Sequence, residues 1–237
     1  MTCAIAVAPG VSAGISLAAA GDMALSREWI LPNRGLLRDR LGIPRERLYG
    51  ARQVHSQRVL VVDGRPAGDV AREEADGLLT ADSRAALSVT VADCLPIFLA
   101  DRRTGAFGML HSGWKGTGIV LEAVQLLARR FGCRPGDITA VIGPGIGACC
   151  YTVSPERAAL FTGRYGSAVV SAGPSGPRLD LREANLVLLG EAGVADVTVV
   201  TDCTSCSPWL GSFRRQGPGA YTLMLAWIAG AQAGASP

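Results

Sequence analysis

The chain contains 237 residues, of which 49% are hydrophobic and 18% are charged, and its formal net charge at pH 7 is +3. This composition excludes a disordered chain, because it supplies enough apolar side chains for a sizeable core. Acidic and basic residues are interspersed rather than clustered on one segment, so we expect no nucleic-acid partner.

No charged residue precedes Asp22, so the N-terminal stretch has to be tested as a signal or membrane segment. It has no basic start, and Pro9, Gly10 and Gly14 interrupt any continuous helix. We therefore predict a strand at 4–8 followed by a glycine-rich turn, and no membrane partner. The seven cysteines are an odd number in a chain long enough to fold without disulfides, which favours reduced thiols and a cytoplasmic location.

Three helices are predicted from apolar periodicity and capping residues. The first covers 26–41 and is interrupted at Pro32. Thr117 is expected to cap a second helix over 118–132, and Ser154 to open a third, shorter one.

A further helix is predicted at 181–193, where Asp180 and Glu183 make a start that resembles a capping box. The stretch 171–178 is expected to be an exposed loop. Strand patterns follow at 59–62, 86–91, 96–99, 106–110, 139–142 and 197–200. This alternation predicts one mixed α/β domain over residues 1–237.

Both histidines of the chain lie in polar stretches beside predicted strands, His55 in "RQVHS" and His111 in "LHSGWKG". Cys94 interrupts the apolar stretch "VTVADCLPIFLAD" 17 positions before His111 (111 − 94), a spacing that fits a strand, a turn and a returning strand. Two imidazoles and a thiolate suit zinc, and three protein ligands leave a fourth position for water. A metal-free pair with Cys94 as nucleophile activated by His111, or a buried cysteine with two unrelated histidines, are the alternatives.

Two charged residues lie close to these three. Asp93 precedes Cys94, where it could simply cap a turn through backbone amides. Lys115 is the single lysine and lies in the glycine-containing loop "SGWKGTG", which leads into a predicted helix. An ammonium at such a helix start suits phosphate, and an ordinary surface lysine is an equal alternative.

Cysteine and arginine motifs near the C-terminus have weaker implications. Cys203 and Cys206 form a CxxC without a second CxxC, which is a weak indication of a structural zinc or a redox role. Cys150 follows Cys149 in "IGPGIGACCY", where the glycines suit a tight turn or a close backbone approach. Arg214 in "SFRRQG" could bind an anion, although a solvated arginine pair is the commoner case.

Taken in order, several motifs resemble the bacterial laccase-domain family, whose members are variously named polyphenol oxidase, peptidoglycan editing factor, or multifunctional purine nucleoside phosphorylase and adenosine deaminase. The resemblance covers about residues 50 to 217 and rests on "RQVHS", "EADGLLT", "VTVADCLPIFLAD", "GMLHSGWKG", "IGPGIGACCYTV", "DLREANLVLLGEAGV", "DCTSC" and "SFRRQG".

This resemblance implies a mixed-sheet α/β sandwich related to cysteine-hydrolase-like toxin domains. It implies a zinc site of His55, Cys94 and His111 beside a nucleoside pocket, in which Cys94, His111 and Asp93 are the catalytic residues. The substrates would be a purine nucleoside and phosphate. Lys115 and Arg214 are the expected phosphate-binding residues, and Gln53 and Cys150 the expected substrate-binding residues.

The chain also departs from the family pattern. "VAPGVSAGISLAAAGD" lacks the arginine and asparagine usual near the family's N-terminus, "PGAYTLM" replaces a glycine-arginine-methionine segment, and Lys115 replaces a common arginine. The rival functions are a copper-dependent phenol oxidase, an amidase that edits cell-wall precursors, and a nucleoside-binding protein without activity. Two histidines are too few for the imidazole-rich sites of multicopper chemistry.

Overall fold

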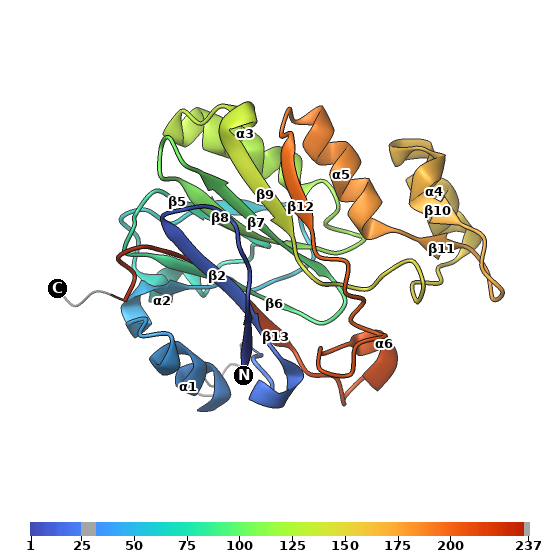
Figure 1. Cartoon of the computed structure of the whole chain (residues 1–237), viewed down its shortest axis with the longest axis horizontal. Helices are drawn as coiled ribbons and strands as arrows, with labels where there is room; N and C mark the ends of the chain where they lie inside the picture. The colour runs from blue at the N-terminus through green and yellow to red at the C-terminus, as the bar shows by residue number, and fades with distance from the viewer. Residues whose placement is uncertain (25–31, 235–237) are drawn as a thin grey trace.

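Two mixed β-sheets lie face to face in the computed structural model, which describes residues 1–24 and 32–234 (Figure 1). The six-stranded sheet has the order β12 (Asp196–Val199), β9 (Ile138–Ile142), β7 (Leu95–Asp101), β8 (Phe107–Ser112), β5 (Gly77–Thr80) and β4 (Val59–Val61). The five-stranded sheet has the order β1 (Thr2–Ala4), β2 (Val11–Ser16), β13 (Met224–Gly230), β6 (Ala86–Val91) and β3 (Leu48–Tyr49). The predicted mixed α/β fold is confirmed.

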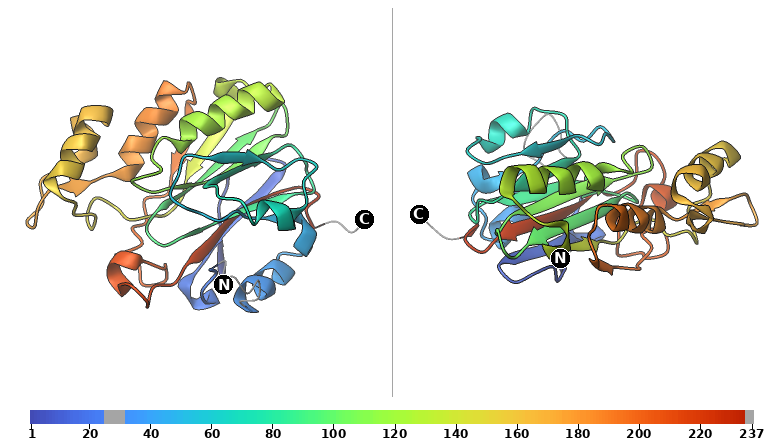
Figure 2. Two further views of the ribbon diagram at one scale, coloured as in Figure 1. Left: turned by 180° about the vertical axis from the view of Figure 1, so that it is seen from behind. Right: turned by 90° about the horizontal axis from the view of Figure 1, so that it is seen from above.

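Helices cover the outer face of the six-stranded sheet (Figures 1 and 2). These are α3 (Ile119–Phe131) and α5 (Leu181–Glu191), and α4 (Pro155–Tyr165) packs beside α5. The other α-helices of the described residues are α1 (Pro32–Arg40), α2 (Ala67–Val70) and α6 (Phe213–Gln216), and β10 (Val170–Ser171) and β11 (Arg178–Leu179) form a separate hairpin. Within the described ranges, no helix combines the length and apolarity needed to cross a bilayer.

Strand β7 shows how the sequence builds two cores. Successive side chains of a strand point to opposite faces of its sheet, so a strand that is apolar throughout can pack on both sides. Leu95, Ile97 and Leu99 belong to the cluster under the helices, whereas Phe98 and Ala100 belong to the cluster between the two sheets. The uninterrupted apolar run of this strand is thus explained by burial on both faces.

The N-terminal segment differs from the prediction. Instead of one strand at 4–8, the structure has β1, which ends at Ala4, and β2, which begins at Val11, and the two pair antiparallel. Gly14 is inside β2 and not in a turn, because a Cβ there would lie 2.5 Å from a ring atom of Trp227 on β13. Close packing, rather than a turn, explains this glycine.

Two of the helix starts are confirmed and one is wrong. The Ser154 side chain accepts a hydrogen bond from the Arg157 amide, and Asp180 accepts two from the first turn of α5. Thr117 does not cap α3; its hydroxyl donates to the Gly113 carbonyl, and Gly118 occupies the N-cap position in a left-handed conformation. The glycine takes this position because its φ of +114° is strained for other residues.

Other predictions hold in part. Residues 26–31 of the first predicted helix lie outside the described residues, and α1 begins at the predicted interruption. The loop predicted at 171–178 is observed at 172–177, because Ser171 and Arg178 pair with each other in the β10–β11 hairpin. The strands β2, β3, β5, β10, β11 and β13 are not among the predicted ones.

Candidate metal centre and its cavity

His55, Cys94 and His111 come together in space. Each offers one ligand atom, and these atoms all lie within 4.8 Å of one another. Cys94 immediately precedes β7, and in the antiparallel pairing of β7 with β8 the partner of Pro96 is His111. The predicted arrangement of strand, turn and returning strand is therefore the one observed. His55 comes from the segment between β3 and β4, and its ring meets that of His111 edge to face at a centroid distance of 4.8 Å.

A carboxylate that was not predicted, that of Asp76, organises two of these residues. It is 1% exposed and accepts hydrogen bonds from the backbone amides of Val54, His55 and Ser56, and from the Ser56 hydroxyl. Its Oδ1 also lies 2.8 Å from Nδ1 of His111. Because an ionised carboxylate only accepts hydrogen bonds, Nδ1 of His111 carries the proton, which leaves Nε2 available as a ligand.

In the metal-free protein the electrostatics of the group favour a thiolate beside an imidazolium, and a metal ion would displace the proton on Nε2 of His111. Burial alone would raise the pKa of Cys94, but hydrogen bonds with His111 and His55 lower it to about 6. Burial would lower the pKa of His111, whereas hydrogen bonds to Asp76 and Cys94 raise it to about 9. The pKa of Asp76 is about 2, because hydrogen bonds from His111 and Ser56 outweigh its burial. The carboxylate is therefore ionised at neutral pH.

Glycines in "HSGWKG" make room for the cluster. A Cβ on Gly113 would lie 2.7 Å from Sγ of Cys94 and 3.4 Å from a ring carbon of His55. A Cβ on Gly116 would lie 2.8 Å from the Ser56 carbonyl oxygen. Both glycines let the loop after β8 pass close to the loop that carries His55. The donor set of one thiol and two imidazoles fits a metal ion, with a fourth position left for a ligand.

A cavity of about 620 Å³ opens over this group. This volume lies within the range typical of small-molecule sites. Its lining includes aromatic side chains and two arginines, from segments far apart in the sequence. The residues that line it are Gln53, His55, Thr90, Ala92, Asp93, Cys94, His111, Trp114, Ile146, Tyr151, Arg157, Leu181, Phe213, Arg214, Tyr221 and Leu223.

Asp93 lines the cavity, but both of its carboxylate oxygens are engaged with the protein. Oδ1 accepts from the Thr204 hydroxyl over 2.6 Å, and Oδ2 accepts from the Arg214 amide over 2.7 Å. Its φ of +93° places it in the left-handed region, which aspartate enters more readily than most residues. The geometry thus gives Asp93 a role in joining three loops, and its catalytic role stays a prediction.

Gln53 and Arg214 also line the cavity with much of their hydrogen-bonding capacity already used. The Gln53 amide exchanges hydrogen bonds with the backbone and hydroxyl of Thr90. The Arg214 guanidinium donates to the carbonyls of Cys150 and Thr152 over 3.0 and 3.2 Å. These contacts fix the cavity wall, and they leave the aromatic rings and the other arginine as the freer recognition groups.

Lys115, which the sequence predicts to meet phosphate, is not among the residues that line the cavity. It is exposed, and its ammonium lies 5.5 Å from the ring centroid of Trp114. Arg157, in the first turn of α4, does line the cavity, with its guanidinium 3.9 Å from the same centroid. The geometry favours Arg157 over Lys115 as the cation that meets an anionic ligand.

Cys150, predicted to bind substrate, belongs to a different group. The thiols of Cys149, Cys150, Cys203 and Cys206 all lie within 4.8 Å of one another. The CxxC pair thus acquires its partners from another loop. Cys150 does not line the cavity, although its carbonyl anchors Arg214.

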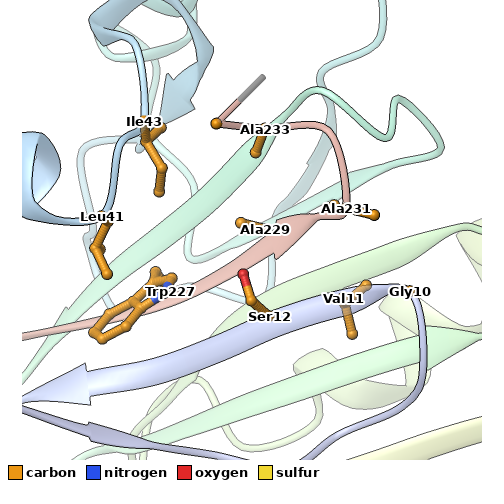
Figure 3. A pocket seen from close by; sticks show the side chains of 11 residues that line it. Gly10, Val11, Ser12, Leu41, Ile43, Trp227, Ala229, Ala231 and Ala233 are labelled. Carbon is orange, nitrogen blue, oxygen red and sulfur yellow. The ribbon is translucent and has the colours of Figure 1, made fainter. Parts of the chain in front are cut away.

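A second cavity, of about 310 Å³, is of a different kind (Figure 3). It lies at the five-stranded sheet, between β2, β13 and the segment around Leu41 and Ile43. Its lining consists of glycines, alanines, other apolar residues and one serine. None of the described residues that line it is ionisable, so we do not consider it a catalytic site.

Sequence reasoning missed Asp76 and Arg157. Asp76 lies in "EADGLLT", which carried part of the family resemblance, but nothing local shows that its carboxylate serves a histidine 35 positions away. Arg157 follows the helix start at Ser154, where periodicity reveals the helix and not what its first turn faces. The one local signal for Asp76 is that it directly precedes the buried strand β5.

Two stacked mixed sheets carry one thiol and two imidazoles in a cavity at the strand ends. The chain is thus an α/β protein with a candidate metal centre. The chain belongs to the family described as "Multi-copper polyphenol oxidoreductase laccase", whose model matches residues 9–229.

Two proteins named purine nucleoside phosphorylase are similar to this chain over most of their length. A purine nucleoside phosphorylase of Mycobacterium tuberculosis (strain H37Rv) is 32% identical over 201 residues, covering 84% of this chain and 79% of that protein. The purine nucleoside phosphorylase YlmD of Geobacillus stearothermophilus is 34% identical over 221 residues, covering 84% and 78%. The crystal structure of YlmD from this organism aligns with a TM-score of 0.85 at 31% identity, covering 94% of this chain and 92% of that one.

A more distant structure, the Neisseria meningitidis protein NMB0706, aligns with a TM-score of 0.80 at 23% identity, covering 97% and 98% of the two chains. This similarity shows that the fold is shared.

Proposed function

We propose that the chain is a zinc-dependent purine nucleoside phosphorylase. The observation that carries the proposal is the position of His55, Cys94 and His111 in the cavity that also holds Arg157 and several aromatic rings. Relatives named purine nucleoside phosphorylase support the substrate class. Deamination of adenosine and phosphorolysis of methylthioadenosine are further activities within the proposal.

The cavity offers separate groups to the two substrates. The rings of Trp114, Tyr151, Phe213 and Tyr221 provide flat apolar surfaces against which a purine can stack. Arg157 provides the positive charge for phosphate and stands at the N-terminal turn of α4, where the helix dipole adds to it. Phosphate and nucleoside can therefore be held side by side.

In phosphorolysis a phosphate oxygen forms a bond to C1′ of the ribose while the bond from C1′ to N9 of the purine breaks. The purine leaves with the electron pair and takes up a proton, and ribose 1-phosphate is the second product. Zinc, when bound by the three side chains, would supply Lewis-acid polarisation of an oxygen ligand. Asp76 holds Nδ1–H of His111, so that Nε2 keeps its orientation toward Cys94 and the cavity.

Copper is the alternative metal, because two imidazoles and a thiolate suit it as well. Both histidines of the chain are already in this one group, which leaves none for further imidazole-rich copper sites. This donor chemistry favours the phosphorylase over a multicopper phenol oxidase.

Two broader expectations accompany the proposal. We propose that residues 1–237 form one domain, since the N-terminal strand β2 and the C-terminal strand β13 are neighbours in one sheet. We also propose a reducing, cytoplasmic location, which the seven free cysteines support.

The test is a panel of adenosine, inosine, methylthioadenosine, a wall-precursor peptide and a phenol, each assayed with and without phosphate on protein of known metal content. Phosphate-dependent formation of free base and ribose 1-phosphate is expected. Ammonia release without phosphate would show deamination alone, and oxygen uptake with the phenol after copper loading would show an oxidase. Amino-acid release from a wall-precursor peptide would support the amidase, and nucleoside binding without turnover a binding protein.

A further inference from the structure

Four cysteines meet where two parallel strands end. β9 and β12 are parallel neighbours, so the segments that follow them leave the sheet at the same edge. Cys149 and Cys150 belong to the first segment, and Cys203 and Cys206 to the second. A bridge between Gly145 and Cys203 continues the pairing of the two segments beyond the strands.

The separations of the sulfur atoms suit one metal ion. Sγ of Cys206 lies 3.7 Å from that of Cys149 and 3.4 Å from that of Cys150, and all four sulfur atoms lie within 4.8 Å of one another. Four sulfurs bound at about 2.3 Å around a tetrahedral Zn²⁺ lie about 3.8 Å apart. The observed separations are too long for a disulfide, whose S–S bond is about 2.0 Å. They are close to those of a mononuclear tetrathiolate site.

We propose that Cys149, Cys150, Cys203 and Cys206 form a second metal site, a closed tetrathiolate site for Zn²⁺ that is separate from the centre in the cavity. Four protein ligands complete the tetrahedron and leave no position for a substrate, so this site is structural. The inference does not depend on the nucleoside phosphorylase activity.

The surroundings of the four thiols support an anionic cluster. The Gly147 amide donates to Sγ of Cys203 over 3.2 Å, as amides do to metal-bound thiolates. Arg182, which is 9% exposed, donates to the carbonyls of Gly145 and Asp202, and this buried cation lies next to the cluster. A Cβ on Gly147 would lie 3.1 Å from Nη1 of Arg182 and 3.2 Å from Sγ of Cys149, so the glycine keeps this space open.

The cluster also holds one wall of the cavity. Thr204, inside the CxxC, donates to Asp93, and Arg215 donates to the carbonyls of Thr204, Ser205 and Ser207. On the other segment the Cys150 carbonyl accepts from Arg214. A metal ion among the four thiols would therefore fix the loops that position Asp93 and Arg214.

The test is the zinc content of the full chain, purified without added chelator and measured by elemental analysis. We expect two Zn²⁺ per chain in the parent and one in the Cys149→Ser, Cys206→Ser double variant, both of whose altered residues are exposed. The His55→Asn variant should also hold one, and asparagine is chosen because it tolerates the φ of +61° at this position. Cys3→Ser, an exposed cysteine outside both groups, is the matched control and should keep two.

Two further measurements keep the result clear if a variant folds poorly. Co²⁺ substituted into His55→Asn should give the intense charge-transfer and d–d absorption of a tetrahedral thiolate site. Chelation of the parent protein should make five additional thiols reactive toward a chromogenic thiol reagent, the four of this site and Cys94 of the cavity centre. One Zn²⁺ in the parent and none in the double variant would support the tetrathiolate site. The same result would show that the cavity centre holds no zinc.

Other results would overturn the inference. These are a double variant with the same zinc content as Cys3→Ser, iron in place of zinc, or an intact mass of anaerobically purified protein that shows a disulfide among the four cysteines. Parent protein that holds no zinc at this site and takes up none from added Zn²⁺ would also overturn it.

Discussion

Nδ1 of His111 lies 2.8 Å from Oδ1 of Asp76, and the main-chain amide of His111 donates to the Asp76 carbonyl oxygen over 2.7 Å. One aspartate thus holds both the backbone and the ring of a candidate ligand. The same carboxylate accepts from the backbone amides of Val54, His55 and Ser56, so it also positions the second histidine.

Asp76→Asn should therefore reduce metal content at the cavity centre and destabilise the fold. The amide nitrogen would face backbone amides that need an acceptor, and a buried partner of His111 would lose its charge. We expect a loss of about 3 kcal/mol in the free energy of unfolding, measured in urea. Asp69→Asn, at an exposed carboxylate whose ion pair with Arg72 spans 3.7 Å, is the control and should change stability little. Full metal content in Asp76→Asn would show that the carboxylate does not orient the ligands.

The contribution of Asp76 should depend on pH. Its pKa in the folded protein is about 2, below the ordinary value of about 4 that it regains on unfolding. A carboxyl group whose pKa is lower in the folded protein stabilises the fold at pH values above its pKa in the unfolded chain. This stabilisation is lost as the pH falls to its pKa in the folded protein. In metal-free protein, the stability difference between the parent and Asp76→Asn should thus shrink between about pH 4 and pH 2. Urea unfolding at several pH values checks this, and a constant difference would contradict it.

Gly113→Ala should damage the centre without removing a ligand. The new methyl group would lie 2.7 Å from Sγ of Cys94, so the thiol or the loop must move. We expect metal affinity to fall by about tenfold or more, the usual consequence of disturbing the surroundings of a metal ligand. Gly136→Ala is the matched control, because a Cβ there meets nothing within 4 Å. Equal metal affinities, measured by competition with a chromogenic chelator, would mean that the loop yields easily.

Arg157→Ala should weaken phosphate more than Lys115→Ala does. Arg157 lines the cavity, whereas Lys115 is exposed and outside it. Loss of a charged hydrogen bond to phosphate should raise its KM by about tenfold or more, with a smaller change for the nucleoside. Steady-state kinetics with each substrate varied separately make the comparison. A larger effect of Lys115→Ala would restore the assignment made from the sequence.

The sequence was informative where local rules suffice. Ser154 and Asp180 predict the starts of their helices correctly because capping depends on residues within one turn. The strand run after Cys94 is visible because burial on both faces leaves it continuously apolar. The two histidines are identifiable because the chain has no others, and Cys94 is identifiable because it interrupts an apolar stretch.

Long-range pairing does not follow from local sequence rules. Cys149 and Cys203 meet because β9 and β12 run parallel with an entire helical crossover between them, which no spacing rule encodes. Gly14 was read as a turn residue, although its role depends on Trp227 at the other end of the chain. Asp76 was overlooked because its partners lie in other loops.

Since the chain has two histidines and both belong to the cavity centre, every imidazole signal in a nitrogen-15 NMR spectrum of the untagged protein arises from that centre. The tautomer of each ring, and which nitrogen a diamagnetic metal occupies, can be read in solution without assigning any other residue. Titration of the same signals with a nucleoside would report directly on events in the cavity. The scarcity of one residue type thus gives this protein a built-in spectroscopic probe.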